Sequence, residues 1–197
     1  MIRLIDASKV RARMSLLDDD GVNASIESAI DAALIRTSSI LATGFDEGTA
    51  EDLFFVDKYV QVVTNGMYLL RLSHGFVRAD EDIKVYVGRT LAEAMDPLNE
   101  VPLSIKNLEK GFFYYPPEIV EGQYVRVTYS HGFLETEYAP EWLVEAILCY
   151  TAKVLSSQQI YDPKVEISGV YKFLETHAGE IIMPHLRSDS AAIYPMV

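Results

Sequence analysis

The sequence predicts an α+β fold: a helical bundle formed by the N- and C-terminal segments, a central antiparallel β insertion and an extended C-terminal arm. Three observations lead to this prediction. Apolar residues recur at helical spacing before residue 43 and again after residue 140. Between residues 53 and 133, β-branched and aromatic residues alternate with turn residues, as is typical of strands. After Gly179 neither period continues, which indicates an extended segment.

The N-terminal part is expected to hold a short basic helix and a long amphipathic one. Ser8 is placed to cap a helix from Lys9 to about Leu16, and the acidic stretch Asp18–Gly21 has the composition of a turn. A second helix is expected from about Asn23 to Ala42. Its apolar positions recur every three or four residues and are Ile26, Ala29, Ile30, Ala33, Leu34, Ile40 and Leu41.

The central part is expected to consist of hairpins. The run Leu53–Val63 is joined through Asn65-Gly66 to Met67–Leu72, and Asn-Gly favours the type I′ turn of a two-residue hairpin. A second hairpin is expected where Glu109-Lys110-Gly111 separates two apolar runs. The further strands expected are Ile83–Val87, Val101–Leu108, Phe112–Tyr115 and Gln123–Ser130.

The C-terminal part begins with a helix that Pro140 opens and that runs to about Gln159. Because this helix is apolar on most faces, we expect it at the centre of the core or shared with another subunit. A shorter helix is expected near Val170–His177. We therefore expect a single domain over 1–197, with helical parts 1–50 and 139–180, a β module 53–133 and a C-terminal arm 181–197.

Composition limits the class of protein. The 197 residues are 49% hydrophobic, which is enough for a core. The net charge of −12 disfavours binding of this chain to the phosphate backbone of nucleic acids. No signal-peptide core is expected at the N-terminus, and the apolar stretch Trp142–Leu155 is too short and too interrupted for a bilayer. The one cysteine, Cys149, leaves no internal disulfide and no cysteine-based zinc site to be expected.

No motif supports catalysis. The acids of Asp18–Gly21 lack the alternation of a calcium loop, and neither a nucleophile elbow nor a glycine-rich phosphate loop occurs. The tetrapeptide Ser-His-Gly-Phe occurs twice, so His74 and His131 could meet at one sheet edge. A metal there would need a carboxylate such as Asp80 or Glu135. We therefore expect no enzyme, no cofactor and no catalytic or metal-binding residue.

Two segments are candidates for protein contacts. The first helix is basic, whereas Asp18–Asp57 holds ten acids and one base, so a basic helix paired with an acidic neighbour is expected. The apolar tail without a period suits an arm that orders on a partner. The expected partner-binding residues are Arg3, Lys9, Arg11, Arg13, Ile181, Ile182, Met183, Leu186, Ile193, Tyr194 and Met196.

Several of these features, taken in order, resemble the head–tail connector (adaptor) proteins of tailed bacteriophages. The resemblance is carried by the acidic turn and Ala/Ile-rich helix of Asp18–Ala33, by the strand and turn Val125–Phe133, and by the Pro-started helix Ala139–Ile147. It covers roughly residues 8–43 and 124–160. The central β segment departs from the smaller, mostly helical adaptors and is closer in outline to longer ones with an inserted sheet.

The resemblance implies a structural protein of the virion neck, made in the host cytoplasm. Such adaptors form a ring, typically dodecameric, below the portal, extend the DNA channel and dock tail or stopper proteins. Twelve copies of this chain would carry about −144 formal charges, which would repel DNA and let it pass without specific binding. No membrane partner is implied.

Three alternatives stay open. The first is another neck or tail-completion protein of the virion. The second belongs to a different class: an acidic inhibitor that mimics DNA and blocks a host enzyme, which would need acids spaced like phosphates on one face. The third is a metal-dependent enzyme that uses His74 and His131.

Overall fold

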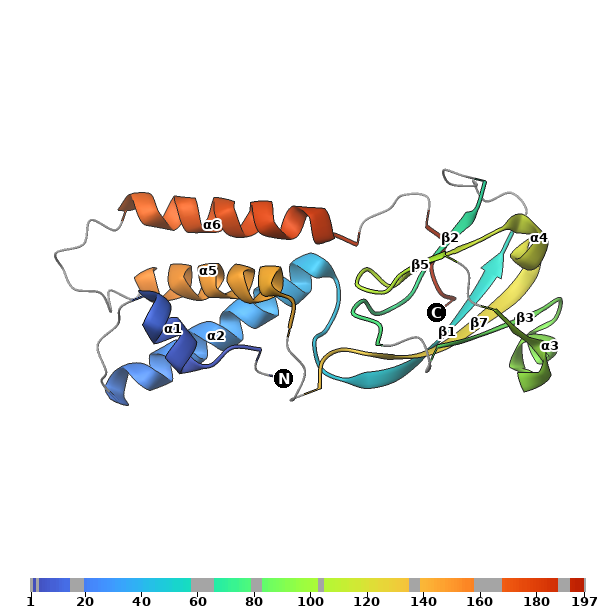
Figure 1. Cartoon of the computed structure of the whole chain (residues 1–197), viewed down its shortest axis with the longest axis horizontal. Coiled ribbons are helices and arrows are strands. Elements are labelled where there is room, and N and C mark those ends of the chain that lie inside the picture. Colours follow the sequence, from blue (N-terminus) through green and yellow to red (C-terminus); the bar gives the residue numbers. More distant parts are fainter. Residues whose placement is uncertain are drawn as a thin grey trace. The chain divides into compact units, whose positions relative to one another are not determined.

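The computed structural model describes residues 2, 4–14, 20–57, 66–78, 83–102, 105–134, 139–157, 168–187 and 192–196. It confirms the α+β class (Figure 1). The chain divides into two compact units: a helical unit (Met1–Ala42 and Glu135–Leu186) and a β unit (Thr43–Leu134 and Arg187–Val197).

The helical unit is formed by segments from both ends of the chain. Its helix α5 packs against α1, α2 and α6, which confirms a central place for this apolar helix. The elements are α1 (Ala7–Met14), α2 (Asp20–Leu41), α5 (Glu141–Ser157), α6 (Ser168–Ile182) and the 3-10 turn η3 (Met183–His185).

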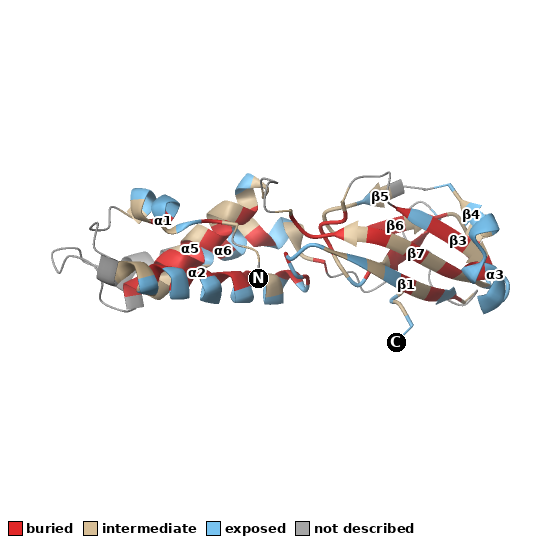
Figure 2. Ribbon diagram, turned by 90° about the horizontal axis from the view of Figure 1, so that it is seen from below, coloured by how far each residue is buried: buried red, intermediate tan, exposed pale blue. Residues whose placement is uncertain are grey.

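The apolar residues expected at helical spacing in α2 form the buried face of this helix. Ile26, Ile30 and Leu34 are at most 1% exposed, and Figure 2 shows this buried stripe beside an exposed one. Buried Thr37 and Thr151 donate to the carbonyl oxygens four residues earlier, so their hydroxyls lie in the core without an unpaired donor.

Helix α1 begins earlier than expected, and its cap is a different residue. Asp6 Oδ1 accepts from the Lys9 amide at 2.8 Å and from the Ser8 hydroxyl at 2.6 Å. Asp6, not Ser8, therefore caps the helix, because a carboxylate is a stronger acceptor beside the helix dipole. These bonds also lower the pKa of Asp6, with the Ser8 hydroxyl contributing most.

The β unit contains two antiparallel sheets. The four-stranded sheet has the order β1-β7-β3-β4, and the three-stranded sheet has the order β2-β6-β5. The elements are β1 (Gly48–Val56), β2 (Tyr68–Arg71), β3 (Lys84–Gly88), α3 (Leu91–Met95), η2 (Pro97–Asn99), β4 (Glu100–Val101), β5 (Ile105–Asn107), β6 (Phe112–Tyr115), α4 (Pro117–Val120) and β7 (Gln123–His131).

One expected hairpin is confirmed: β5 pairs with β6 through a turn in which Gly111 has φ +64°. The other was expected to join Leu53–Val63 to Met67–Leu72 through Asn65-Gly66, and its connection, residues 58–65, lies outside the described residues. Among the described residues, β1 pairs with β7 and β2 pairs with β6. Both sheets bury apolar side chains in one core, including Phe54, Leu70 and Val127.

The C-terminal arm is also corrected. Ile181 and Ile182 continue α6, which extends five residues beyond the expected end at His177. Ile182 is 1% exposed, so burial in the helical unit favours the longer helix. The segment 192–196 is extended, as expected, and lies against the β unit.

Candidate partner-binding surfaces

The basic residues expected to contact partners are partly engaged within the helical unit. Arg11 bonds to Asn23 of α2, and Arg13 forms an ion pair with Glu145 of α5 at 2.8 Å. Lys9 is exposed on α1, and Arg3 lies outside the described residues. Arg13 therefore pairs with an acid of α5, which lies outside the acidic segment Asp18–Asp57.

The apolar residues expected in the arm divide between the two units. In the helical unit, Ile182 is buried, Ile181 and Leu186 are half-buried, and Met183 is 68% exposed. Met183 is therefore the member of this group that a partner can reach most readily.

The end of the chain adds a short extended segment to the edge of β2. The Ile193 amide donates to the Leu69 carbonyl at 2.8 Å, and the Ile193 carbonyl accepts from the Arg71 amide at 2.9 Å. The Met196 amide donates to the Leu53 carbonyl at 2.6 Å. The tail thereby covers one edge of the three-stranded sheet, the kind of edge that otherwise pairs with other chains.

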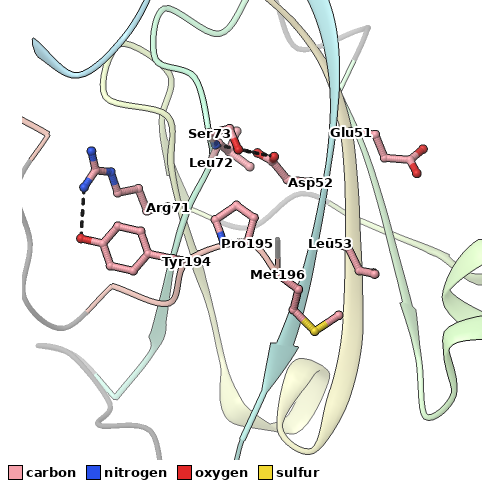
Figure 3. A pocket seen from close by; sticks show the side chains of 9 residues that line it. All are labelled: Glu51, Asp52, Leu53, Arg71, Leu72, Ser73, Tyr194, Pro195 and Met196. Atoms are coloured by element: carbon pink, nitrogen blue, oxygen red, sulfur yellow. Dashed lines mark hydrogen bonds between the residues drawn. The ribbon is translucent and has the colours of Figure 1, made fainter. Parts of the chain in front are cut away.

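A pocket of about 610 Å³ opens beside this tail (Figure 3). Arg71 donates to the Tyr194 hydroxyl at 3.0 Å, and its guanidinium carbon lies 5.1 Å from the centre of the Tyr194 ring. Tyr194 and Met196 are 52% and 44% exposed. The pocket is lined by Glu51, Asp52, Leu53, Arg71, Leu72, Ser73, Tyr194, Pro195 and Met196.

Asp52, one of the residues that line this pocket, forms a buried polar centre. It lies on the inward face of β1 and is 5% exposed. Its carboxylate accepts from the Ser73 amide at 2.7 Å, the Ser73 hydroxyl at 2.6 Å and the Tyr129 hydroxyl at 2.7 Å. Burial first, and then the Asp52 hydrogen bond, raise the pKa of Tyr129 far above its ordinary value, so Tyr129 stays a donor.

The two Ser-His-Gly-Phe turns meet, which the repeat in the sequence had left open. The rings of His74 and His131 stack in parallel with their centres 3.8 Å apart. The ring centres of Phe76 and Phe133 lie 4.9 Å apart. Burial, above all, lowers the pKa of both histidines, which favours two neutral rings. In the described part of the chain, no third ligand atom joins this pair for a metal; Asp80 and Glu135 lie outside that part.

Arg187 is a structural residue that the sequence did not single out. It is 3% exposed and donates to the carbonyls of Lys110 at 2.8 Å, Leu72 at 2.6 Å and Ser73 at 3.3 Å. Burial lowers its pKa to about 10, so it remains charged at neutral pH. It fastens the segment after η3 to the β unit. No local pattern signals this, because its partners are more than 70 residues away.

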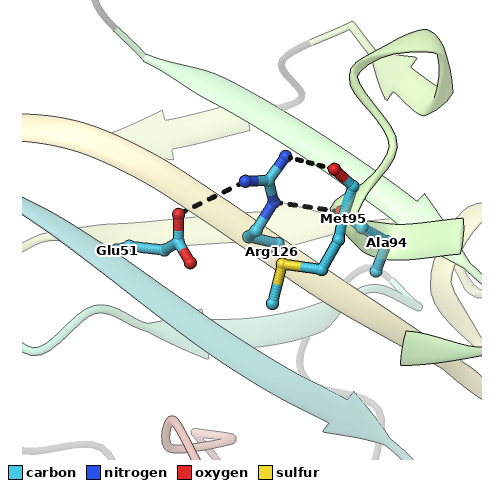
Figure 4. A network of polar contacts seen from close by, with 4 residues as sticks. All are labelled: Glu51, Ala94, Met95 and Arg126. Atoms are coloured by element: carbon cyan, nitrogen blue, oxygen red, sulfur yellow. Dashed lines mark hydrogen bonds and ion pairs between the residues drawn. The ribbon is translucent and has the colours of Figure 1, made fainter. Parts of the chain in front are cut away.

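A second missed surface surrounds α3. Arg126 of β7 donates to the carbonyls of Ala94 at 3.0 Å and Met95 at 3.3 Å, and it pairs with Glu51 (Figure 4). These bonds hold the end of α3 against the four-stranded sheet. Around it, Leu91, Met95 and Leu98 are exposed by 45%, 41% and 89%. Exposed apolar side chains that gather at one place on a surface are typical of protein contact sites.

Among the described residues, three metal-ligand types converge in the helical unit: Glu145, Cys149 and His177. The spacing of Glu145 and Cys149, four residues apart on one helix, was visible in the sequence. The approach of His177 was not, because it depends on how α6 packs on α5.

None of the helices in the described ranges has both the length and the apolar character of a bilayer span.

No family model matches the sequence, and no curated protein matches it. Solved structures with some likeness come from gene transfer agent (GTA) particles. They are a chain of the neck of an empty GTA particle (TM-score 0.48, 11% identity, 94% of this chain and 91% of that one), a chain of the native GTA virion (0.44, 13%, 89% and 91%) and a chain of the native GTA neck (0.42, 13%, 87% and 86%).

Proposed function

We propose that this chain is a structural protein of a virion neck: a head–tail adaptor that forms a ring below the portal, extends the DNA channel and docks tail or stopper proteins, without catalysis. One observation carries the proposal. Helices from both ends of the chain pack into one unit around α5, and the β segment between them forms a unit of its own. This is the arrangement implied by the resemblance to adaptors with an inserted sheet.

The outward face of α2 supports contact between neighbouring copies. Because α1, α2 and α6 already cover α5, the apolar residues left for a neighbour lie elsewhere. Ile35 and Ile40 of α2 are 55% and 38% exposed, in a helix whose other face is fully buried. Burying such side chains against a second copy would stabilise a ring by about 1 kcal/mol or more for each.

Charge and exposed contact residues support the other parts of the proposal. The net charge of −12 suits a channel wall that DNA passes without adhering. For portal or tail proteins, the expected residues that are exposed in the described chain are Lys9, Arg13, Met183, Tyr194 and Met196. Arg3, Arg11 and Arg13 remain part of the proposed basic contact.

Electron microscopy of the purified full-length chain, alone and mixed with its portal, tests the proposal. We expect closed rings, or rings formed on the portal. Ile35→Lys combined with Ile40→Lys should abolish them, because each places a charge in the proposed contact. Thr49→Lys, which adds a charge at an exposed position of the β unit, should leave the rings intact.

A chain that stays monomeric and never binds a portal ring would overturn this function. A basic host enzyme as its main partner would instead favour the DNA-mimic alternative.

A further inference from the structure

Three side chains of different chemistry face one another between α5 and α6. Glu145 and Cys149 lie one turn apart on α5, and His177 lies on α6. A carboxylate oxygen, the sulfur and a ring nitrogen all lie within 4.8 Å of one another. Cys149 is 5% exposed, whereas Glu145 and His177 are half-buried, so the group is reachable from solvent at one side.

This donor set suits one class of ion. A thiolate, an imidazole and a carboxylate together favour Zn²⁺ over Mg²⁺ or Ca²⁺, which prefer oxygen alone. Ligand bonds of about 2.0–2.3 Å place tetrahedral donors roughly 3.3–3.8 Å apart. The present separations therefore need only small side-chain rotations to close around an ion, with water as a fourth ligand.

One neighbour of the cluster would support a bound cation, and another competes with it. Glu180, one turn after His177, has a carboxylate oxygen 4.0 Å from His177 Nδ1, and carboxylates beside ligating imidazoles commonly orient the ring. Arg13 Nη2 lies 2.8 Å from Glu145 Oε1, the same oxygen that the Cys149 sulfur approaches, so Arg13 competes with an ion for this carboxylate. The Cys149 sulfur lies 3.9 Å from the Glu145 oxygen, a long and weak hydrogen bond that leaves the sulfur available.

We propose that Glu145, Cys149 and His177 bind one Zn²⁺ ion, and that the ion fastens α6 to α5. Binding breaks the S–H bond of Cys149, forms the Zn–S bond and releases the proton to solvent. The role is structural, since the ion joins two helices that the sequence separates.

Titration of the tag-free, chelator-treated full-length chain with ZnCl₂ tests this proposal. A non-thiol reductant keeps Cys149 reduced without competing for the metal. We expect one equivalent bound per chain and a higher thermal unfolding temperature with zinc. With CoCl₂ as the probe, we expect the near-ultraviolet absorption band of a thiolate bound to cobalt, which reports the Cys149 ligand directly.

Variants at the half-buried ligands distinguish this site from adventitious binding. His177→Gln and Glu145→Gln should each weaken zinc binding at least tenfold and remove the thermal shift. Glu141→Gln, one turn earlier on the same helix, is the matched control and should bind as the parent chain does. Arg13→Gln should bind zinc a few-fold more tightly, because it removes a competing positive charge.

The proposal is overturned if wild-type protein binds less than one equivalent, if His177→Gln binds zinc as tightly as wild type, or if cobalt gives no thiolate band. None of these readouts depends on ring formation, so a failure here would leave the proposed neck function untouched.

Discussion

Asp52 carries a charge into a sheet face that otherwise buries apolar side chains. Its neighbours in the inward row of β1, Phe54 and Val56, are fully buried. Asp52 is tolerated there because Ser73 and Tyr129 supply three hydrogen-bond donors. The carboxylate thereby links β1 to Tyr129 of β7 and to Ser73, which follows β2.

We expect Asp52→Ala to lower the free energy of unfolding of the β unit by about 3 kcal/mol, because it leaves the Tyr129 hydroxyl and the Ser73 amide buried without an acceptor. Urea denaturation followed by circular dichroism measures this change. Glu51→Gln, at the next residue of the same strand, is the control and should cost less than about 1 kcal/mol, since its ion pair with Arg126 is half-exposed. Equal losses in both variants would contradict a special role for Asp52.

The stacked histidines make stability depend on pH in a defined direction. Burial, above all, holds the pKa of His74 and His131 below 6.5 in the folded chain, so the unfolded chain binds protons more readily. The stabilising contribution is therefore complete above about pH 6.5 and is lost as the pH falls toward the lowered pKa values.

We expect the urea midpoint of the wild-type chain to fall between about pH 7.5 and 5.5, and His131→Gln to show a smaller fall. The quantity compared is the slope of the urea midpoint against pH, so a general loss of stability in the variant does not affect the comparison. Parallel pH profiles of the two proteins would show that the histidine stack does not cause the dependence.

At the scale of elements, the turn after β7 tightly constrains the shape of the backbone. Gly132 has φ +79°, and a Cβ atom there would lie 2.1 Å from the Asp46 carbonyl oxygen. Gly122, in the turn before β7, has φ +69°, but a Cβ atom there would meet nothing within 4 Å. The two glycines share a conformation and differ in the space around them.

This difference makes a matched pair of substitutions. Gly122→Ala should cost about 1–2 kcal/mol, the cost of a left-handed conformation alone. Gly132→Ala should cost at least about 2 kcal/mol more, because the backbone near Asp46 has to move. Urea midpoints of the two purified variants decide the matter, and equal midpoints would mean that the close approach to Asp46 imposes no constraint.

Across the whole molecule, sequence patterns predicted elements well and pairings poorly. The buried stripe of α2, the alternation of β7 and the β5–β6 hairpin all depend on neighbouring residues, and all were predicted. The partner of β1 was not, because Gln123–His131 lies about 70 residues further along the chain. The stacking of His74 on His131 could be suggested from the repeated tetrapeptide but not established by it.

The sequence by itself determined the fold class, the helix and strand types and the acidic charge, since these follow from local periodicity and composition. The tertiary structure alone decided that the chain packs as two units, that Ile193 lies against β2, that Arg187 is buried and that His177 approaches Cys149. The physical reason is that each of these contacts joins residues far apart in the chain, and burial of a shared core, which no local pattern encodes, selects them from many alternatives.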